Sequence, residues 1–189
     1  MTTPLVNRPS QDQTQPRWVV TLRDRTQVLI RPLAHTDREA ERTFIEGLSA
    51  QSRRFRFLGS IKSPSEALLD RLTDVDQVHD VAFVAVVPEG AGERMVGVAR
   101  YSADKTGEQC ECAVTVADDW HGRGLGTALM RHLIEVARAR GIRTMESIDS
   151  AENLEMQDLA RFLGFHTRVD PNDARQMLHR LDLAGSTWG

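Results

Sequence analysis

Apolar residues along the chain fall into short continuous runs and one long amphipathic pattern. The short runs are rich in Val, Ile and other strand-forming residues, with turn-forming residues between them, which is typical of buried or half-buried strands. From Leu125 to Ala137 apolar residues recur at helical spacing, and Gly141 follows as a helix-terminating residue. The pattern predicts one long helix and strands over residues 19–22, 28–32, 81–87, 95–103, 108–116, 144–149, 165–169 and 177–183.

Polar capping signals predict three further helices in the first half of the chain. Thr36-Asp37-Arg38-Glu39 has the form of a capping box and is expected to open a helix that reaches about Leu48. Ser49 is expected to begin a second helix. Ser63-Pro64-Ser65-Glu66 predicts a third, with Pro64 at the first helical position, where its missing N–H costs nothing.

Length and charge narrow the class of protein. The 189 residues suit one α/β domain, expected over residues 17–185, and residues 1–16, rich in Gln, Thr and Pro, are expected to form a flexible tail. A net charge of −3 gives no general attraction to nucleic acid or to an anionic membrane, and no apolar run is long enough for a membrane span. Cys110 and Cys112 lie two apart on one predicted strand, where a mutual disulfide is disfavoured, so a reducing cytoplasm is expected.

The segment from Trp120 to Thr127 reads W-H-G-R-G-L-G-T and joins a predicted strand to the long helix. Without side chains, its glycines let the backbone approach an anion closely, and the first free N–H groups of the helix point partial positive charge at it. The segment therefore predicts a loop that binds a phosphate or pyrophosphate. A tight turn in which the glycines serve packing alone is the alternative.

Two common nucleotide loops do not fit this segment. A Rossmann fingerprint would need a glycine where Leu129 stands, and a Walker loop would need Gly-Lys-Ser/Thr. The segment instead resembles the Gln/Arg-x-x-Gly-x-Gly/Ala motif with which the GNAT superfamily of N-acetyltransferases binds the pyrophosphate of coenzyme A, with Gly124 and Gly126 as its glycines. His121 stands at the first motif position, where the family more often has Gln or Arg. It can donate a hydrogen bond, and its charge depends on pH.

A second stretch, Glu152 to Met156 with Leu163-Gly164-Phe165, resembles a later helix of the same superfamily. The resemblance implies that Asn153 hydrogen-bonds the pantetheine arm or the phosphates of the coenzyme, and a helix-capping role is compatible with that contact. Many members have a tyrosine seven residues after this Asn, which protonates the departing thiolate. That position here is Ala160, and Tyr101, the only tyrosine, lies on another predicted strand.

Arg31-Pro32-Leu33, Asp37 and the stretch from Leu48 to Phe57 resemble the acetyltransferase domain of bacterial Pat-type protein lysine acetyltransferases. In that subgroup a Glu ten residues before the first motif position is the general base, and the matching residue is Glu111. A lysine amine, with a pKa of about 10.4, must lose a proton before it attacks a thioester, and a carboxylate in a desolvated cleft can accept it. A plain alternating strand with Glu111 facing water is the alternative interpretation.

The resemblance also implies that a backbone N–H polarises the thioester carbonyl, seven residues before the motif, at Val114. Glu111 and Val114 are an odd number of positions apart, so a regular strand points their side chains to opposite faces. The family meets this geometry with a β-bulge that also splays the two central strands. We therefore expect a bulge between Cys112 and Val116.

The resemblance as a whole implies a single GNAT-type α/β (α+β) domain. Its mixed, mostly antiparallel sheet of about seven strands is expected to be flanked by helices and splayed at the two central strands. The expected reaction transfers an acetyl group from acetyl-CoA to a primary amine, with a protein lysine as the first choice of acceptor. A small-molecule amine or antibiotic acceptor and a non-catalytic acetyl-CoA sensor are the alternatives.

The same resemblance supplies the candidate site residues and partners. No metal, nucleic acid or membrane partner is expected, and the chain is expected to be a monomer or a homodimer. The catalytic candidates are Glu111 and Val114, and the coenzyme-binding candidates are Val114, Thr115, Val116, His121, Gly122, Arg123, Gly124, Leu125, Gly126, Thr127 and Asn153.

Overall fold

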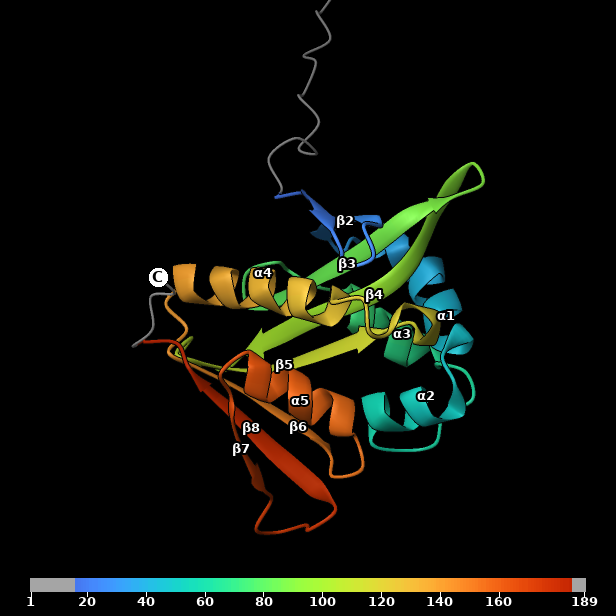
Figure 1. The fold of residues 1–189 in the computed structure, drawn as a ribbon. Helices are drawn as coiled ribbons and strands as arrows, with labels where there is room; N and C mark the ends of the chain where they lie inside the picture. Colours follow the sequence, from blue (N-terminus) through green and yellow to red (C-terminus); the bar gives the residue numbers. More distant parts are fainter. Residues whose placement is uncertain (1–15, 185–189) are drawn as a thin grey trace, which may run out of the picture.

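Eight strands form one sheet in the order β1-β2-β3-β4-β5-β6-β8-β7 in the computed structural model, which describes residues 16–184 (Figure 1). Neighbouring strands run antiparallel except β5 and β6. The expected mixed, mostly antiparallel sheet is confirmed, with eight strands, where the family resemblance implied about seven. The tail expected over residues 1–16 lies, apart from Pro16, outside the described residues. The strands are β1 (Trp18–Thr21), β2 (Gln27–Pro32), β3 (Asp80–Glu89), β4 (Gly92–Ala103), β5 (Gln109–Val116), β6 (Thr144–Ser150), β7 (His166–Val169) and β8 (Gln176–Asp182).

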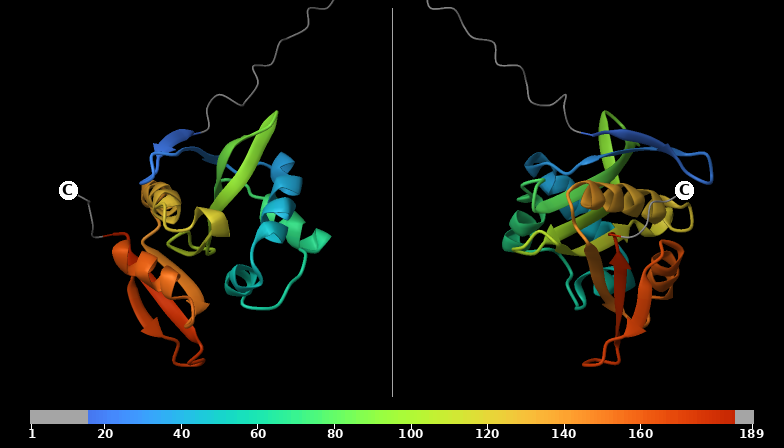
Figure 2. Two further views of the ribbon diagram at one scale, coloured as in Figure 1. Left: turned by 45° about the vertical axis from the view of Figure 1, so that its right-hand side comes forward. Right: turned by 90° about the vertical axis from the view of Figure 1, so that its left-hand side faces the viewer.

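Helices cover both faces of the sheet (Figure 2). One face packs against α4 through β3, β4 and β5, and the opposite face packs against α1 through β4 and against α2 through β5 and β6. The apolar stripe expected from Leu125 to Ala137 is buried along α4. The helices are α1 (Arg38–Gly47), α2 (Ala50–Phe57), α3 (Glu66–Thr73), α4 (Leu125–Ala139) and α5 (Leu154–Phe162), with 3-10 turns η2 (His35–Asp37) and η3 (Asp118–Trp120).

The start of α1 differs from the expected capping box. The Asp37 carboxylate accepts hydrogen bonds from the Arg31 guanidinium at 2.8 and 2.9 Å and from the Ala34 N–H at 2.8 Å. These bonds hold the chain in the 3-10 turn η2, so α1 begins only at Arg38 and the Thr36 side chain caps nothing. The prediction of a Thr36 capping box is therefore wrong.

Helix α2 starts where predicted, and helix α3 starts later than predicted. The Ser49 hydroxyl accepts the Ser52 N–H at 3.1 Å, so the predicted start of α2 is confirmed. Helix α3 starts two residues later than predicted, because Ser65 rather than Ser63 is the cap and its hydroxyl accepts the Leu68 N–H at 3.2 Å. Pro64 therefore precedes the helix instead of occupying its first position.

The two central strands diverge after a short stretch of pairing. β5 pairs with β6 only over three residues, from Gln109 to Glu111. Beyond Glu111, β5 stays paired with β4 as far as Val116, while β6 stays paired with β8 as far as Ser150. The predicted splay between the two central strands is thereby confirmed, and it leaves one edge of β5 without a strand partner.

The bulge expected in β5 between Cys112 and Val116 is absent. Register with β4 runs without a shift from Gly97 opposite Val116 to Ala103 opposite Cys110. The register shift of this region lies instead between β3 and β4, at Ala85 and Val86. The prediction was wrong because it compared side-chain directions, whereas the group expected to polarise the thioester is a backbone amide, which lies in the plane of the sheet.

The Val114 N–H lies in the plane of the sheet and points to the free edge of β5 without any bulge. The Ala117 N–H donates to the Val96 carbonyl across the β4 edge at 2.9 Å, while the Glu108 carbonyl accepts the Arg143 N–H from the β6 side at 2.7 Å. Backbone groups alternate between the two edges of a strand, so even-numbered residues of β5 face β6. The N–H of Val114 therefore points into the gap that the splay opens.

A first prediction concerns Leu129, which is fully buried between α4 and the sheet. A Cβ added at Gly97 of β4 would lie only 2.9 Å from Leu129 Cδ1, so the leucine fills the space that the glycine leaves. Leu129→Ala is expected to lower the free energy of unfolding by about 2–5 kcal/mol, because the cavity cannot be refilled by a glycine neighbour. Urea denaturation measures this change. Glu135→Ala, at an exposed position of the same helix, should change it by less than about 0.5 kcal/mol.

Candidate active site

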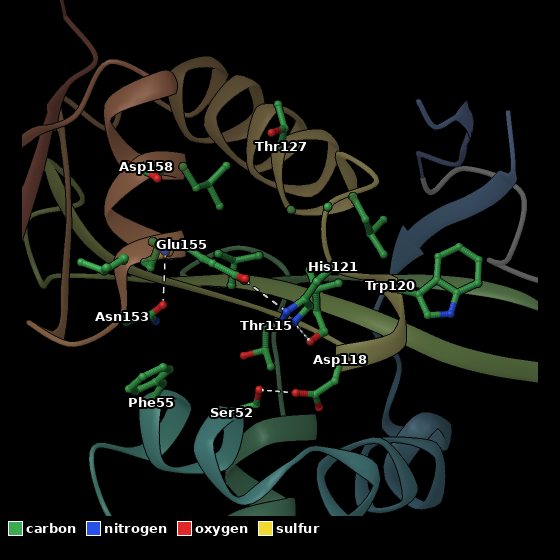
Figure 3. Close-up of a pocket in the computed structure, with 18 of the residues that line it drawn as sticks. Ser52, Phe55, Thr115, Asp118, Trp120, His121, Thr127, Asn153, Glu155 and Asp158 are labelled. Carbon is green, nitrogen blue, oxygen red and sulfur yellow. Dashed lines mark hydrogen bonds and ion pairs between the residues drawn. The ribbon is translucent and has the colours of Figure 1, made fainter. Parts of the chain in front are cut away.

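A cleft of about 830 Å³ lies where the two halves of the sheet diverge (Figure 3). Its walls come from the end of β5, the start of α4, one side of α5 along its whole length and one side of α2. Two predicted site residues, Glu111 and Arg123, do not line it. The predicted residues that line it are Val114, Thr115, Val116, His121, Gly122, Gly124, Leu125, Gly126, Thr127 and Asn153.

The glycine loop before α4 has the conformation that an anion site requires. Gly122 and Gly124 have φ values of 74° and 88°, in the left-handed region that favours glycine. Gly124 is the N-cap of α4, and it has no side chain that could occupy the first amides of the helix. Those amides therefore face the cleft with the positive end of the helix dipole.

Gly126 serves packing as well. A Cβ at this position would lie 3.3 Å from Leu159 Cδ2 of α5 and 3.7 Å from Val116 Cγ2 of β5. The missing side chain thus lets α4 approach both neighbours closely. The two interpretations of the loop apply to different glycines, since Gly122 and Gly124 set its backbone shape and Gly126 sets its distance from α5.

His121 connects the two sides of the cleft. Its Nε2 lies 3.0 Å from the Val116 carbonyl oxygen, and its Nδ1 lies 3.1 Å from a carboxylate oxygen of Glu155 in the first turn of α5 (Figure 3). Both partners are hydrogen-bond acceptors, so the ring contacts one acceptor on each side. His121 therefore connects the end of β5 to the first turn of α5 beside the glycine loop.

Arg123 braces the loop from outside the cleft. Its guanidinium donates to the Asp24 carboxylate at 3.0 Å and to the Asp119 carbonyl at 2.8 Å, and it lies 4.6 Å from the centre of the Trp120 ring. A different arginine, Arg23 of the β1–β2 turn, lines the cleft next to Gly124. Sequence reasoning missed Arg23, because a residue about a hundred positions before the motif gives no local signal.

Asn153 is placed by two hydrogen bonds at the start of α5. Its side-chain oxygen accepts the Met156 N–H at 3.2 Å and so caps the helix, and its amide nitrogen donates to the Asp149 carboxylate at 3.3 Å. Burial raises the pKa of Asp149 to about 6, against the opposing effects of this hydrogen bond and of the Arg56 charge. Asp149 is a second carboxylate near the splay, and no sequence motif marked it.

Glu111 lies at the point where β5 and β6 separate. Its side chain is exposed, between the buried Cys110 and Cys112, which are both free thiols. An exposed side chain agrees with the alternative in which Glu111 faces water. It also agrees with a base that receives its substrate from outside, so burial alone does not separate the two interpretations.

Arg56 of α2 brings a positive charge to the same region. Burial lowers the pKa of its guanidinium to about 10, and the nearby Arg100 acts in the same direction, so Arg56 remains a cation at neutral pH. Carboxylates that oppose this lowering are those of Glu41, Asp149 and Glu111.

No tyrosine hydroxyl lines the described part of the cleft. Ala160, at the position where the family resemblance led us to look for a tyrosine, is buried in α5. Tyr101 is buried elsewhere, where its hydroxyl accepts a hydrogen bond from Arg140 at 3.3 Å and burial raises its pKa. Among residues 16–184 no group of His, Cys, Asp and Glu side chains has the arrangement of a metal site, and no helix is long and apolar enough to cross a membrane.

Comparison with known proteins agrees with this architecture. Residues 45–165 match the acetyltransferase (GNAT) family. The chain is 55% identical over 166 residues to Acetyltransferase PA5475 of Pseudomonas aeruginosa, which covers 88% of the chain and 89% of that protein. It is 33% identical over 111 residues to Acetyltransferase Pat of Mycolicibacterium smegmatis, which covers 58% of the chain and 33% of that longer protein.

A third relative and two solved structures extend the comparison. The L-methionine sulfoximine/L-methionine sulfone acetyltransferase of Pseudomonas aeruginosa is 37% identical over 86 residues, 43% of the chain and 49% of that enzyme. The GNAT domain of Streptomyces lividans PAT superposes with a TM-score of 0.80 at 26% identity, over 88% of the chain and 96% of the domain. The acetyltransferase yncA of Salmonella typhimurium, solved with acetyl-CoA, shares the fold with a TM-score of 0.67 at 19% identity, over 87% of the chain and 98% of yncA. The chain belongs to the GNAT family of acetyltransferases.

Proposed function

We propose that the protein transfers the acetyl group of acetyl-CoA to the side-chain amine of a protein lysine. The observation that carries the proposal is the free edge of β5, where the Val114 N–H points into the gap beside the strand position of Glu111. The resemblance to Pat-type protein lysine acetyltransferases supports a lysine acceptor, and the chain matches Pat and the GNAT domain of a second PAT.

The coenzyme end of the cleft, Gly122–Thr127 with Arg23 and Asn153, fits a diphosphate. The loop offers helix N-terminal amides without a capping side chain, and Arg23 adds a cation beside Gly124. Acetyl-CoA bound there supplies the activated acetyl group. We assign the diphosphate to these amides and to His121, and the pantetheine arm to the edge of β5 at Val114 and Val116 and to Asn153.

The acceptor end of the cleft lies toward Glu111 and Arg56. In the proposed reaction the Glu111 carboxylate takes a proton from the lysine ammonium, directly or through one water. The neutral amine attacks the thioester carbonyl, whose oxygen accepts a hydrogen bond from the Val114 N–H as negative charge develops on it. The carbon–sulfur bond then breaks and the nitrogen gives its second proton to water, which leaves an amide and the coenzyme A thiolate; the thiolate is then protonated by water.

A small-molecule amine is the second candidate acceptor. The relative named as acetyltransferase of L-methionine sulfoximine and L-methionine sulfone supports it, because this name denotes an amino-acid acceptor. The match covers less than half of either chain. A sensor that binds acetyl-CoA without turnover is the third possibility, and Ala160 in place of tyrosine favours it.

A second prediction tests the general base. Glu111→Gln keeps the shape of the side chain but cannot accept a proton, so kcat/KM for lysine peptides is expected to fall about 10²–10⁴-fold near pH 7. Thiol release with acetyl-CoA measures the rate. The loss should shrink as pH approaches the pKa of the lysine amine, because free amine then becomes abundant.

Asp149→Asn is the contrasting variant for this test. Its side-chain oxygen can still accept the Asn153 hydrogen bond, so it changes charge with little change of contact. If Asp149→Asn lost the activity and Glu111→Gln kept it, the base would be Asp149 and the assignment of Glu111 would fail. Coenzyme binding by both variants without turnover of any amine by the wild type would favour the sensor.

A third prediction concerns the contact between His121 and Glu155. The Glu155 carboxylate would repel coenzyme phosphates and compete with them for the His121 ring, so Glu155→Gln is expected to tighten coenzyme A binding roughly two- to fivefold at low salt. His121→Ala is expected to weaken binding. Calorimetry on both variants measures the two effects, with Glu135→Gln, on α4 away from the cleft, as the matched control. Weaker binding by Glu155→Gln would show that this carboxylate helps to build the site instead of competing with the ligand.

A further inference from the structure

The three arginines of α2 differ in what their guanidinium groups contact. Arg53 donates to three backbone carbonyl oxygens, and Arg54 pairs with the Glu152 carboxylate at 2.7 Å. The Arg56 guanidinium lies 5.1 Å from the centre of the Phe57 ring, and no residue among 16–184 accepts a hydrogen bond from it. Arg56 also lines the cleft, which the other two arginines do not.

Arg56 belongs to the acceptor end of the cleft. The charged groups that act on it include Glu111, the proposed base, and Asp149 at the end of β6. Ser52, one turn before Arg56 on α2, donates a hydrogen bond to the Asp118 carboxylate at 2.7 Å, and Asp118 precedes the glycine loop. Arg56 lies at the other end of α2, so we place its guanidinium at the acceptor end of the cleft.

The guanidinium belongs to a half-buried residue, so a ligand that displaces water from it must replace the hydrogen bonds that the water makes. Its planar fork of N–H donors matches a carboxylate with two parallel hydrogen bonds. The carboxylates nearby act on it through charge without forming such bonds, and Glu41 is already bonded to Arg100 at 2.9 Å. A ligand carboxylate would supply the missing acceptors.

We infer that the acceptor carries a carboxylate as well as its reacting amine, and that Arg56 binds this carboxylate; the inference rests on the function proposed above. The ammonium of such an acceptor faces Glu111 while its carboxylate faces Arg56. An amine without a carboxylate meets the same cation with nothing to neutralise it. Polycationic amines are therefore poor acceptors, and lysines or amino acids with a nearby carboxylate are good ones.

Pairs of acceptors that differ by one carboxylate test the inference and show which part of the acceptor supplies the carboxylate. Nα-acetyl-lysine is compared with Nα-acetyl-lysine amide, and a capped peptide with Glu beside an internal lysine is compared with its Gln counterpart. We expect kcat/KM to be about ten- to hundredfold higher for the carboxylate member of one pair, mainly through KM. The first pair indicates a free amino acid or C-terminal carboxylate, and the second an acidic neighbour in a protein.

Substitutions at Arg56 test whether this residue makes the distinction. Arg56→Gln is expected to reduce the preference within the responding pair to near one, and Arg56→Lys to leave an intermediate preference. Arg54→Gln, on the same helix but directed at Glu152, should keep the full preference. Coenzyme A affinity and the melting temperature of each variant show that the fold and the coenzyme end of the cleft are intact.

Equal rates within both pairs in the wild type would overturn the inference, as would an Arg56→Gln variant that slowed both members of a pair equally. Calorimetry of Nα-acetyl-lysine and its amide, and of both peptides, with the protein saturated with coenzyme A tests the same contact without turnover. The protein could bind one carboxylate member selectively, lose this selectivity in Arg56→Gln, and yet transfer no acetyl group. That result would support the contact with Arg56 and would count only against the proposed function.

Discussion

Pairing between β5 and β6 stops after Glu111, and the site depends on the free strand edge that this leaves. The Val114 N–H would form a hydrogen bond with β6 if the pairing continued. It is available for a ligand instead, while β5 stays paired with β4 on its other side. Its direction is fixed by the strand and costs no reorganisation when charge develops on a bound carbonyl. The same divergence makes room for the cleft and brings α2 and α5 to its two sides.

The features that the sequence predicted well are those encoded over a few residues. The glycine loop lines the cleft and the apolar stripe from Leu125 onward is buried, because a glycine cluster before a helix and helical spacing can both be read from neighbouring residues. The bulge was mispredicted because side-chain parity describes the faces of a strand and not its edges. The Thr36 cap failed because Arg31 holds the Asp37 carboxylate from a separate strand.

The charged residues in and near the cleft were harder to find, because they come from distant parts of the chain. Arg23 comes from the first hairpin, Arg56 from α2 and Asp149 from the end of β6. No spacing in the sequence connects them, since the topology of the sheet is what brings them together. Arg123 shows the converse, because it lies within the motif and yet its side chain leaves the cleft to bind Asp24.

Position 160 is an alanine instead of a tyrosine, and this substitution is compatible with direct transfer of the acetyl group from the thioester to an amine. A thiol has a pKa of about 8.5, so its conjugate base is a stable leaving group near neutral pH and needs no proton in the transition state. The lysine ammonium, in contrast, cannot attack until a proton is removed, because its nitrogen has no free lone pair. In the proposed reaction the catalytic demand therefore falls on the base and on the amide that binds the carbonyl oxygen. We assign these roles to Glu111, where pairing of β5 with β6 ends, and to Val114, three positions further along the free edge.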